Sequence, residues 1–195
     1  IAQRMCGDIA GMGAVKTALS NGEATVNVAI TAGKAVADML TEMKAKTVQA
    51  NQAGLDTDSR TALNNDFTSL RDQLETIVKT AEFNGKNLIT SAATSLTVLS
   101  TVDGSSISVA AQKLDTTTLG INASNISSGA SAALVAIDAA INTVTSSLAS
   151  LGSSSKRIDV QAEFTVQLVD ILKEGVGNLV DADLAEESAA LQSLQ

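Results

Sequence analysis

The chain has 195 residues, a formal net charge of −8 and a sequence pI of about 4.4, and it contains no His, Trp, Tyr or Pro. A nucleic-acid-binding protein would present basic stripes and a zinc site needs Cys and His ligands, so the composition argues against both. Hydrophobic residues make up 45% of the chain but aromatic residues only 2%. The core is therefore expected to consist of helix–helix seams built from small and aliphatic side chains.

The first predicted element is a helix over residues 2–53. Apolar or small side chains follow one another along it in alternating steps of four and three residues, which is typical of long packed helices. Gly22 and Gly33 lower helix propensity, so we expect another backbone to approach closely there, and Gly54 is the expected C-terminal cap. The row consists of Val15, Leu19, Gly22, Val26, Ala29, Gly33, Val36, Leu40, Met43 and Thr47.

A second helix is predicted over residues 57–81, with Asp56 or Thr57 as its N-cap. The short link to the first helix predicts that the two helices lie antiparallel. Its apolar stripe consists of Leu63, Phe67, Leu70, Leu74, Ile77 and Ala81.

The middle of the chain is rich in Ser, Thr and Val. Residues 96–101 and 106–110 read as two short strands around an Asp103-Gly104 turn. Because an isolated hairpin is marginally stable, it must pack on the helices. Residues 122–131 read as a linker.

A third long helix is predicted to follow the linker, with a possible irregularity at residues 152–155. Its apolar row again alternates between steps of three and four residues. The row consists of Leu134, Ile137, Ile141, Val144, Leu148, Leu151, Ser155, Ile158, Ala162, Thr165, Val169, Leu172, Val176 and Leu179.

These elements predict a mainly α protein, an elongated bundle of long antiparallel, coiled-coil-like helices with one small β-hairpin region. We divide one rod domain into an N-terminal helical part over residues 1–87, a hairpin and linker region over 88–131, and a returning helix over 132–195.

Nothing in the chain indicates an enzyme, a cofactor or a metal site. Cys6 has no partner for a disulfide, and no His is present to activate it as a nucleophile. Acidic pairs such as Asp181 with Asp183 and Glu186 with Glu187 read as solvated charges rather than as acid–base groups. No uninterrupted apolar run reaches the roughly 18 residues needed to cross a membrane, and no signal peptide is visible.

Several segments, taken in their order and spacing, resemble the rod domain of bacterial flagellins of the alphaproteobacterial type. The resemblance covers essentially the whole chain, without the large outer domains of many flagellins and without the terminal segments that polymerise. The similar segments are residues 61–74 in the second helix, Phe83-Asn84-Gly85-Lys86-Asn87-Leu88 after it, residues 151–159 with Leu151-Gly152 and Arg157, and residues 181–192 near the end.

This resemblance implies a structural subunit of the flagellar filament that self-assembles for motility and is located outside the cell. The implied partners are other flagellin subunits, the flagellar export apparatus and the filament cap, without nucleic acid and without membrane insertion. Because the polymerising ends are not among these residues, we expect the chain to stay monomeric in solution.

The resemblance also points to a partner interface on the first helix. Enterobacterial flagellins carry a Leu-Gln-Arg-Val-Arg-Glu-Leu-Ala-Val-Gln motif that the animal flagellin receptor recognises, and residues 40–49 match it at Leu40, Val48 and Gln49. Lys44 keeps a positive charge, whereas Glu42 reverses one and Lys46 replaces a Leu, so weak recognition is expected. The candidate interface residues are Glu42, Met43, Lys44, Lys46, Val48 and Gln49.

An alternative function is a flagellin-like module on the cell surface that binds polysaccharide or host molecules. Its site would lie in the Ser- and Thr-rich hairpin region, with Lys86 and Lys113 nearby in the sequence. Titration with candidate glycans distinguishes this function from that of a structural subunit.

Overall fold

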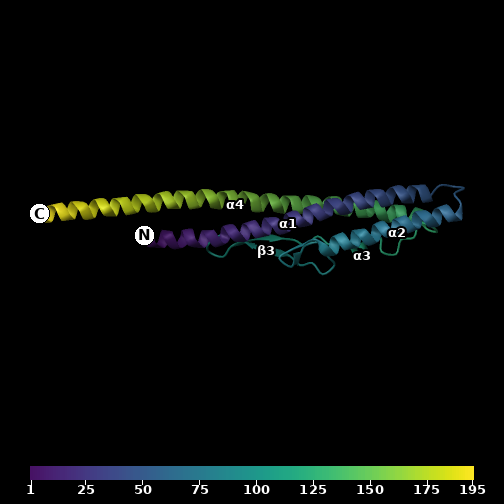
Figure 1. The fold of residues 1–195 in the computed structure, drawn as a ribbon, viewed down its shortest axis with the longest axis horizontal. Coiled ribbons are helices and arrows are strands. Elements are labelled where there is room, and N and C mark those ends of the chain that lie inside the picture. The colour runs from purple at the N-terminus through teal and green to yellow at the C-terminus, as the bar shows by residue number, and fades with distance from the viewer. The chain divides into compact units, whose positions relative to one another are not determined.

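The computed structural model describes all residues, Ile1–Gln195, and shows a mainly α chain with long helices and short antiparallel strand pairs (Figure 1). This confirms the predicted fold class. The elements in chain order are α1 (Ala2–Ala50), α2 (Thr57–Thr80), β1 (Glu82–Phe83), β2 (Lys86–Asn87), β3 (Leu96–Leu99), β4 (Ser106–Val109), α3 (Thr116–Leu119) and α4 (Ala130–Leu194).

The chain forms two compact units, and both long helices contribute to each of them. The first unit consists of Ile1–Glu23, Thr97–Ile107 and Lys156–Gln195, and the second of Ala24–Leu96 and Ser108–Ser155. Each unit is described by itself below.

Helix α1 buries all ten residues of the predicted row, from Val15 to Thr47. The buried Thr47 hydroxyl donates to the carbonyl of Met43 at 2.8 Å, so a polar residue fits the row without an unpaired group. The alternation of three and four residues therefore identified the buried face of α1 correctly.

Helix ends differ from the prediction because local hydrogen bonds decide them. Helix α1 ends at Ala50, and the N–H of Asn51 still donates to the carbonyl of Thr47 at 3.0 Å. Gly54 lies in the link with a φ of +82° and does not cap the helix, which corrects that expectation. Asp56 is the N-cap of α2, since its carboxylate accepts from the N–H of Ser59 at 3.1 Å.

In the second unit, α2 lies antiparallel to the C-terminal part of α1, as predicted. Lys46 near the end of α1 pairs with Asp66 in the first half of α2, and residues farther back on α1, such as Ala32, line one groove with Thr80 at the end of α2. The fully buried side chains of α2 are Phe67, Leu74 and Val78. Val78 was missing from the predicted stripe, and three of the predicted members are only half-buried.

Two hairpins are present rather than one. The β3–β4 hairpin lies where the sequence predicted it, around an Asp103-Gly104 turn in which Gly104 has a φ of +96°. The β1–β2 hairpin was missed, although Asn84 and Gly85 at its turn both have positive φ, at 51° and 75°. Two positive φ values in a two-residue turn fit the natural twist of a hairpin, which favours Asn-Gly there.

In the first unit, the β3–β4 connection packs on both long helices. A Cβ at Gly22 of α1 would lie only 2.6 Å from a methyl group of Val98, so the strand sits directly on the helix backbone. On α4, the amide of Gln161 donates to the carbonyl of Ser100 at 2.8 Å. The expectation of a close approach at Gly22 is thus confirmed, and the contact is with a strand.

Helix α4 is continuous through the predicted irregularity at residues 152–155. One row of buried side chains on α4 recurs every seven residues, at Ile137, Val144, Leu151, Ile158 and Thr165. Residues 181–195 are exposed throughout.

One 18-residue window of α4 has a mean hydropathy of 1.4, and 28% of it is buried. By length and composition this helix is apolar enough to cross a membrane. Ser and Thr residues interrupt the apolar side chains of α4, so the window contains no uninterrupted apolar run of this length. One such helix is weak evidence for a span, because the core helix of a soluble protein passes the same test.

Candidate interaction surfaces

The structure gathers no group of three His, Cys, Asp or Glu side chains that would hold a metal ion. Cys6 is exposed, and the acidic pairs at residues 181–187 lie on the exposed end of α4.

The predicted interface on α1 is split between two faces of the helix. Met43 is fully buried, so its side chain belongs to the core and does not face a partner. Glu42 and Gln49 are exposed, and Val48 is 49% exposed. The outward part of this segment is thus small and mixed in polarity.

The two lysines of this segment are paired within the chain. The ammonium of Lys44 lies 2.8 Å from a carboxylate oxygen of Asp138 on α4, and that of Lys46 lies 3.3 Å from Asp66 on α2. Such partly exposed pairs contribute roughly 0–1 kcal/mol each. They nevertheless hold both ammonium groups beside carboxylates.

The two lysines considered for glycan binding differ in their surroundings. The ammonium of Lys86 donates to the hydroxyl of Thr94 at 2.8 Å and to the carbonyl of Ser95 at 3.2 Å. Lys113 is exposed.

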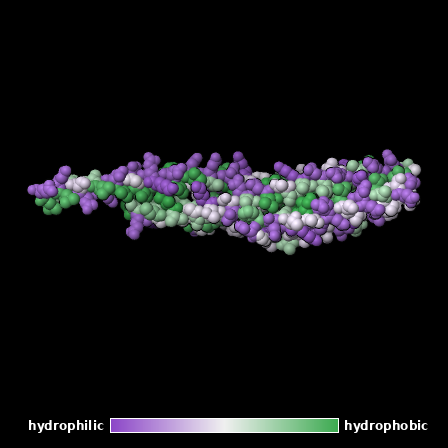
Figure 2. Space-filling model, viewed as in Figure 1, coloured by the Kyte–Doolittle hydropathy of each residue, from purple (hydrophilic) through white to green (hydrophobic).

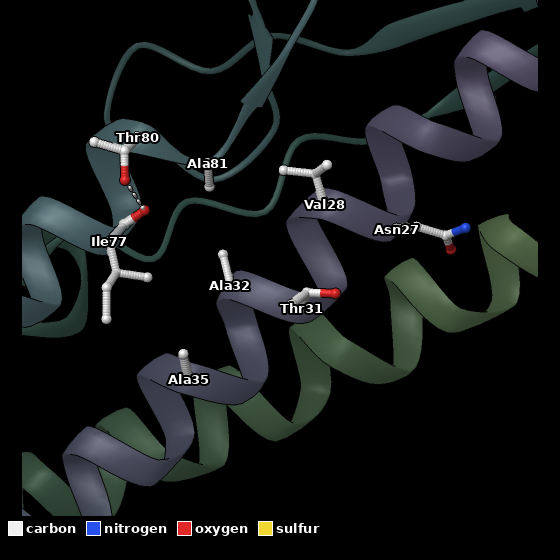
Figure 3. A pocket seen from close by; sticks show the side chains of 8 residues that line it. All are labelled: Asn27, Val28, Thr31, Ala32, Ala35, Ile77, Thr80 and Ala81. Atoms are coloured by element: carbon white, nitrogen blue, oxygen red, sulfur yellow. Dashed lines mark hydrogen bonds between the residues drawn. The ribbon is translucent and has the colours of Figure 1, made fainter.

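An open groove of about 460 Å³ runs between α1 and α2 in the second unit (Figure 3). In Figure 3 the methyl groups of Val28, Ala32 and Ala81 lie around it, and the only polar side chains are one amide and two hydroxyls. No charged residue lines the groove. Its lining consists of Asn27, Val28, Thr31, Ala32, Ala35, Ile77, Thr80 and Ala81.

A stripe of exposed apolar side chains runs along α4 in the first unit. Val160 and Phe164 are each 53% exposed and Ile171 is 63% exposed. Steps of four and seven residues place the three on one face, about 120–160° around the helix from buried Ile158. We call these three residues the α4 stripe. Figure 2 shows hydrophobic side chains open to solvent along this helix.

Carboxyl groups meet across the seam between α1 and α4 in the first unit. Glu23 and Asp159 line one pocket together with Lys16 and Glu163. Burial raises the pKa of the Glu23 carboxyl above its ordinary value, and the nearby charge of Asp159 and a hydrogen bond to it raise this pKa further.

Sequence reasoning did not identify the groove, the α4 stripe or this carboxyl pair. The stripe could have been predicted from the sequence, because Val160, Phe164 and Ile171 are large apolar residues that fall outside the predicted buried row. No pattern in the sequence predicts the groove, since its lining consists mostly of small residues from two separate helices.

Two family models match the chain. Residues 1–94 match the bacterial flagellin N-terminal helical region, and residues 134–195 match the bacterial flagellin C-terminal helical region.

Curated relatives are similar over most of the chain. Flagellin FljK of Caulobacter vibrioides is 44% identical over 189 residues, which cover 95% of this chain and 69% of the relative. Flagellin C of Rhizobium meliloti is 31% identical over 251 aligned residues, covering all of this chain and 77% of that protein.

Solved structures share the fold. The crystal structure of Bacillus cereus flagellin matches with a TM-score of 0.67 and 19% identity, over 74% of this chain and 86% of that one. A putative flagellar hook-associated protein from Vibrio parahaemolyticus matches with a TM-score of 0.73 and 14% identity, over 91% of this chain and 95% of that one.

Proposed function

The chain belongs to the bacterial flagellin family, and from this membership we propose which of its surfaces meet neighbouring subunits. It is a structural subunit of the flagellar filament, an extracellular helical polymer of flagellin copies. Its biochemical work is therefore to form contacts with further copies of itself.

The α4 stripe is the observation that carries the proposal. Three large apolar side chains, each more than half exposed, lie in a row on one face of α4. Exposed apolar rows of this kind mark interaction sites. We assign the α4 stripe to a contact with a neighbouring subunit.

A complementation experiment tests this assignment. The chain is produced as the sole flagellin of a flagellated host, in its natural full-length form, and filaments are counted by electron microscopy. Ile171→Asp is expected to abolish or severely shorten filaments, because it places a charge in an apolar contact. Ile171→Val keeps the apolar surface and should assemble normally.

Exported monomer provides the folding control. An exposed substitution changes stability by only about ±0.5 kcal/mol, so Ile171→Asp monomer should keep its helix content and melting temperature. Filaments of normal length from Ile171→Asp would contradict the proposed contact.

We extend the proposal to the exposed side chains of the 40–49 segment as a partner surface, now without Met43. Toward the animal flagellin receptor this surface is expected to bind weakly. Glu42 presents a carboxylate where the recognised motif has Arg, and Lys46 presents an ammonium held by Asp66 where the motif has Leu. If each of these two positions costs ~2 kcal/mol of binding free energy, the affinity for the receptor falls by on the order of a thousandfold.

A receptor reporter assay on the full-length protein measures this directly. Half-maximal activation is expected far above nanomolar concentrations, and Glu42→Arg combined with Lys46→Leu should recover part of the response. Nanomolar activation by the unchanged protein would overturn the receptor proposal and leave the filament function untouched.

Export through the flagellar apparatus and assembly beneath the cap belong to the same proposal. A single cysteine and the absence of proline suit a chain that is threaded unfolded and folds on arrival. Deleting the host's flagellar export system should leave the chain inside the cell, which fractionation and immunoblotting would detect.

A further inference from the structure

An open helical polymer needs two different, complementary surfaces on each subunit, because a contact that pairs a surface with itself closes into a dimer. Two of the exposed apolar surfaces of this chain differ in kind. One is the α4 stripe, a row of protruding side chains in the first unit, and the other is the groove between α1 and α2 in the second unit.

We propose that the α4 stripe of one copy docks into the α1–α2 groove of the next copy. The inference rests on the proposed filament function and names the surface that receives the stripe. It makes the contact heterologous, so that each added copy leaves a free groove at one end and a free stripe at the other.

The chemistry of the groove selects an apolar occupant. Its lining is mostly methyl and methylene groups, with Asn27, Thr31 and Thr80 as its polar side chains and no charge (Figure 3). A charged side chain placed there would lose hydration without gaining a partner. The aliphatic and aromatic side chains of the stripe would instead move apolar surface out of water, which is favourable.

A second pocket of similar size does not suit the stripe. The pocket beside the α1–α4 seam also measures about 460 Å³, but Lys16, Glu23, Asp159 and Glu163 line it. Apolar side chains entering it would desolvate four charged or titratable groups, which costs free energy.

Net charge favours the same pairing. Two copies that each carry a formal charge of −8 repel one another over most of their surfaces. Contacts between copies are therefore best made where both surfaces lack charge, and the groove and the three residues of the stripe meet that condition.

Paired cysteines test the docking. In a Cys6→Ser background, one cysteine is placed in the groove at Asn27, Thr31 or Thr80 and a second in the stripe at Val160, Phe164 or Ile171. Filaments assembled by the host are oxidised, dissociated and separated on non-reducing gels. A disulfide forms only where two Cα atoms come within about 7 Å.

A heterologous contact makes a specific prediction. At least one pair of positions should give a ladder of covalent multimers, because every copy then links to two neighbours. Each single-cysteine variant should stay monomeric. Val135→Cys replaces the stripe cysteine in the control, since Val135 is 71% exposed on α4 but lies outside the stripe.

The outcomes separate the two claims. Filaments that form normally while no pair exceeds the Val135 control would overturn the docking and leave the filament function standing. Dimers from a single stripe cysteine would also overturn it, because they indicate that the stripe pairs with itself. The stripe contact itself is tested separately, because normal filaments from Ile171→Asp would overturn it.

Discussion

Among single residues, Glu23 is a carboxyl whose pKa is raised by burial between two helices. Its carboxyl lies half-buried on α1 beside Asp159 of α4, and Glu163 lines the same pocket, so Lys16 is the one ammonium among three carboxyl groups there. The exposed ammonium of Lys156 lies one turn before Asp159 on α4. The β3–β4 hairpin brings no carboxylate to the pocket, because Asp103 is bound in its own turn by Thr101 and Ser105.

Protonation of Glu23 should stabilise the first unit. Because folding raises the pKa of this carboxyl above its ordinary value of 4.5, the folded state holds a proton that the unfolded state has already released. The stabilisation is complete below pH 4.5 and is lost as the pH rises through the folded-state pKa.

The variant Glu23→Gln mimics the protonated carboxyl at every pH. It should raise the melting temperature at pH 7 by about 2 °C and flatten the pH dependence of the melting temperature between pH 4 and 7. Thermal melts at several pH values measure both effects, with Glu82→Gln on exposed β1 as the control. If Glu23→Gln melts at a lower temperature than the unchanged protein at pH 7, the proposed role of the carboxyl pair is contradicted.

Gly22 matters for packing because it has no Cβ. A Cβ there would lie 2.6 Å from one methyl group of Val98 and 2.9 Å from the other, and Val98 is a β-branched residue that is almost fully buried. Gly22→Ala should therefore destabilise the protein by about 1–3 kcal/mol through overpacking, despite the better helix propensity of Ala.

Gly13 gives the matched control for this substitution. It lies on the same helix with nothing within 4 Å of an added Cβ. Gly13→Ala should stabilise by up to about 1 kcal/mol. Urea unfolding of both variants checks the pair, and equal effects of the two substitutions would show that the contact with Val98 does not matter.

At the scale of elements, α2 holds the segment that returns to α4. Arg71 donates to the carbonyls of Ile121 at 3.2 Å and Ser124 at 2.8 Å. The side-chain oxygen of Asn64 accepts from the N–H of Ile126, and Glu75 accepts from the N–H of Thr116, both at 2.9 Å. This segment has only the four-residue α3 as regular structure, so side chains of α2 fix its path.

Removing the guanidinium should release part of this segment. Arg71→Ala is expected to cost about 1.5–3 kcal/mol, the usual range for hydrogen bonds made by a charged group, whereas Lys34→Ala at an exposed position of α1 should change stability by no more than about 0.5 kcal/mol. Hydrogen exchange would show faster exchange at the N–H of Ile126 in Arg71→Ala. Unchanged protection there would argue against the role of α2.

The elements also show what the sequence was able to predict. The rows on α1 and α4 were predictable because their period persists over many turns. The α1 row is buried throughout, whereas the α4 row contains buried residues only between Ile137 and Thr165. The β1–β2 hairpin and α3 were not, because elements of two to four residues carry no period. Gly54 was misassigned because the hydrogen bonds around Asn51 end α1 earlier than the apolar pattern suggests.

At the scale of the whole molecule, family and function were predictable while the contact surfaces were not. The flagellin-like segments lie along the whole chain, so their order was readable. The groove forms only when Asn27–Ala35 of α1 come together with Ile77–Ala81 at the end of α2, and no linear motif predicts that contact. For Met43 the sequence suggested a contact that the structure does not offer. A motif match placed it at an interface, but its side chain is fully buried in the core.

The central claim is that the α4 stripe is covered by a neighbouring copy in the filament. The most direct measurement is the rate at which a maleimide labels Ile171→Cys, in a Cys6→Ser background, in intact filaments and in dissociated monomers. Thiol labelling follows exposure, so covering by a neighbour should slow the reaction in filaments by at least about tenfold, while a cysteine on a face that no neighbour covers should react at similar rates in both states. Equal rates for Ile171→Cys in filament and monomer would contradict the account.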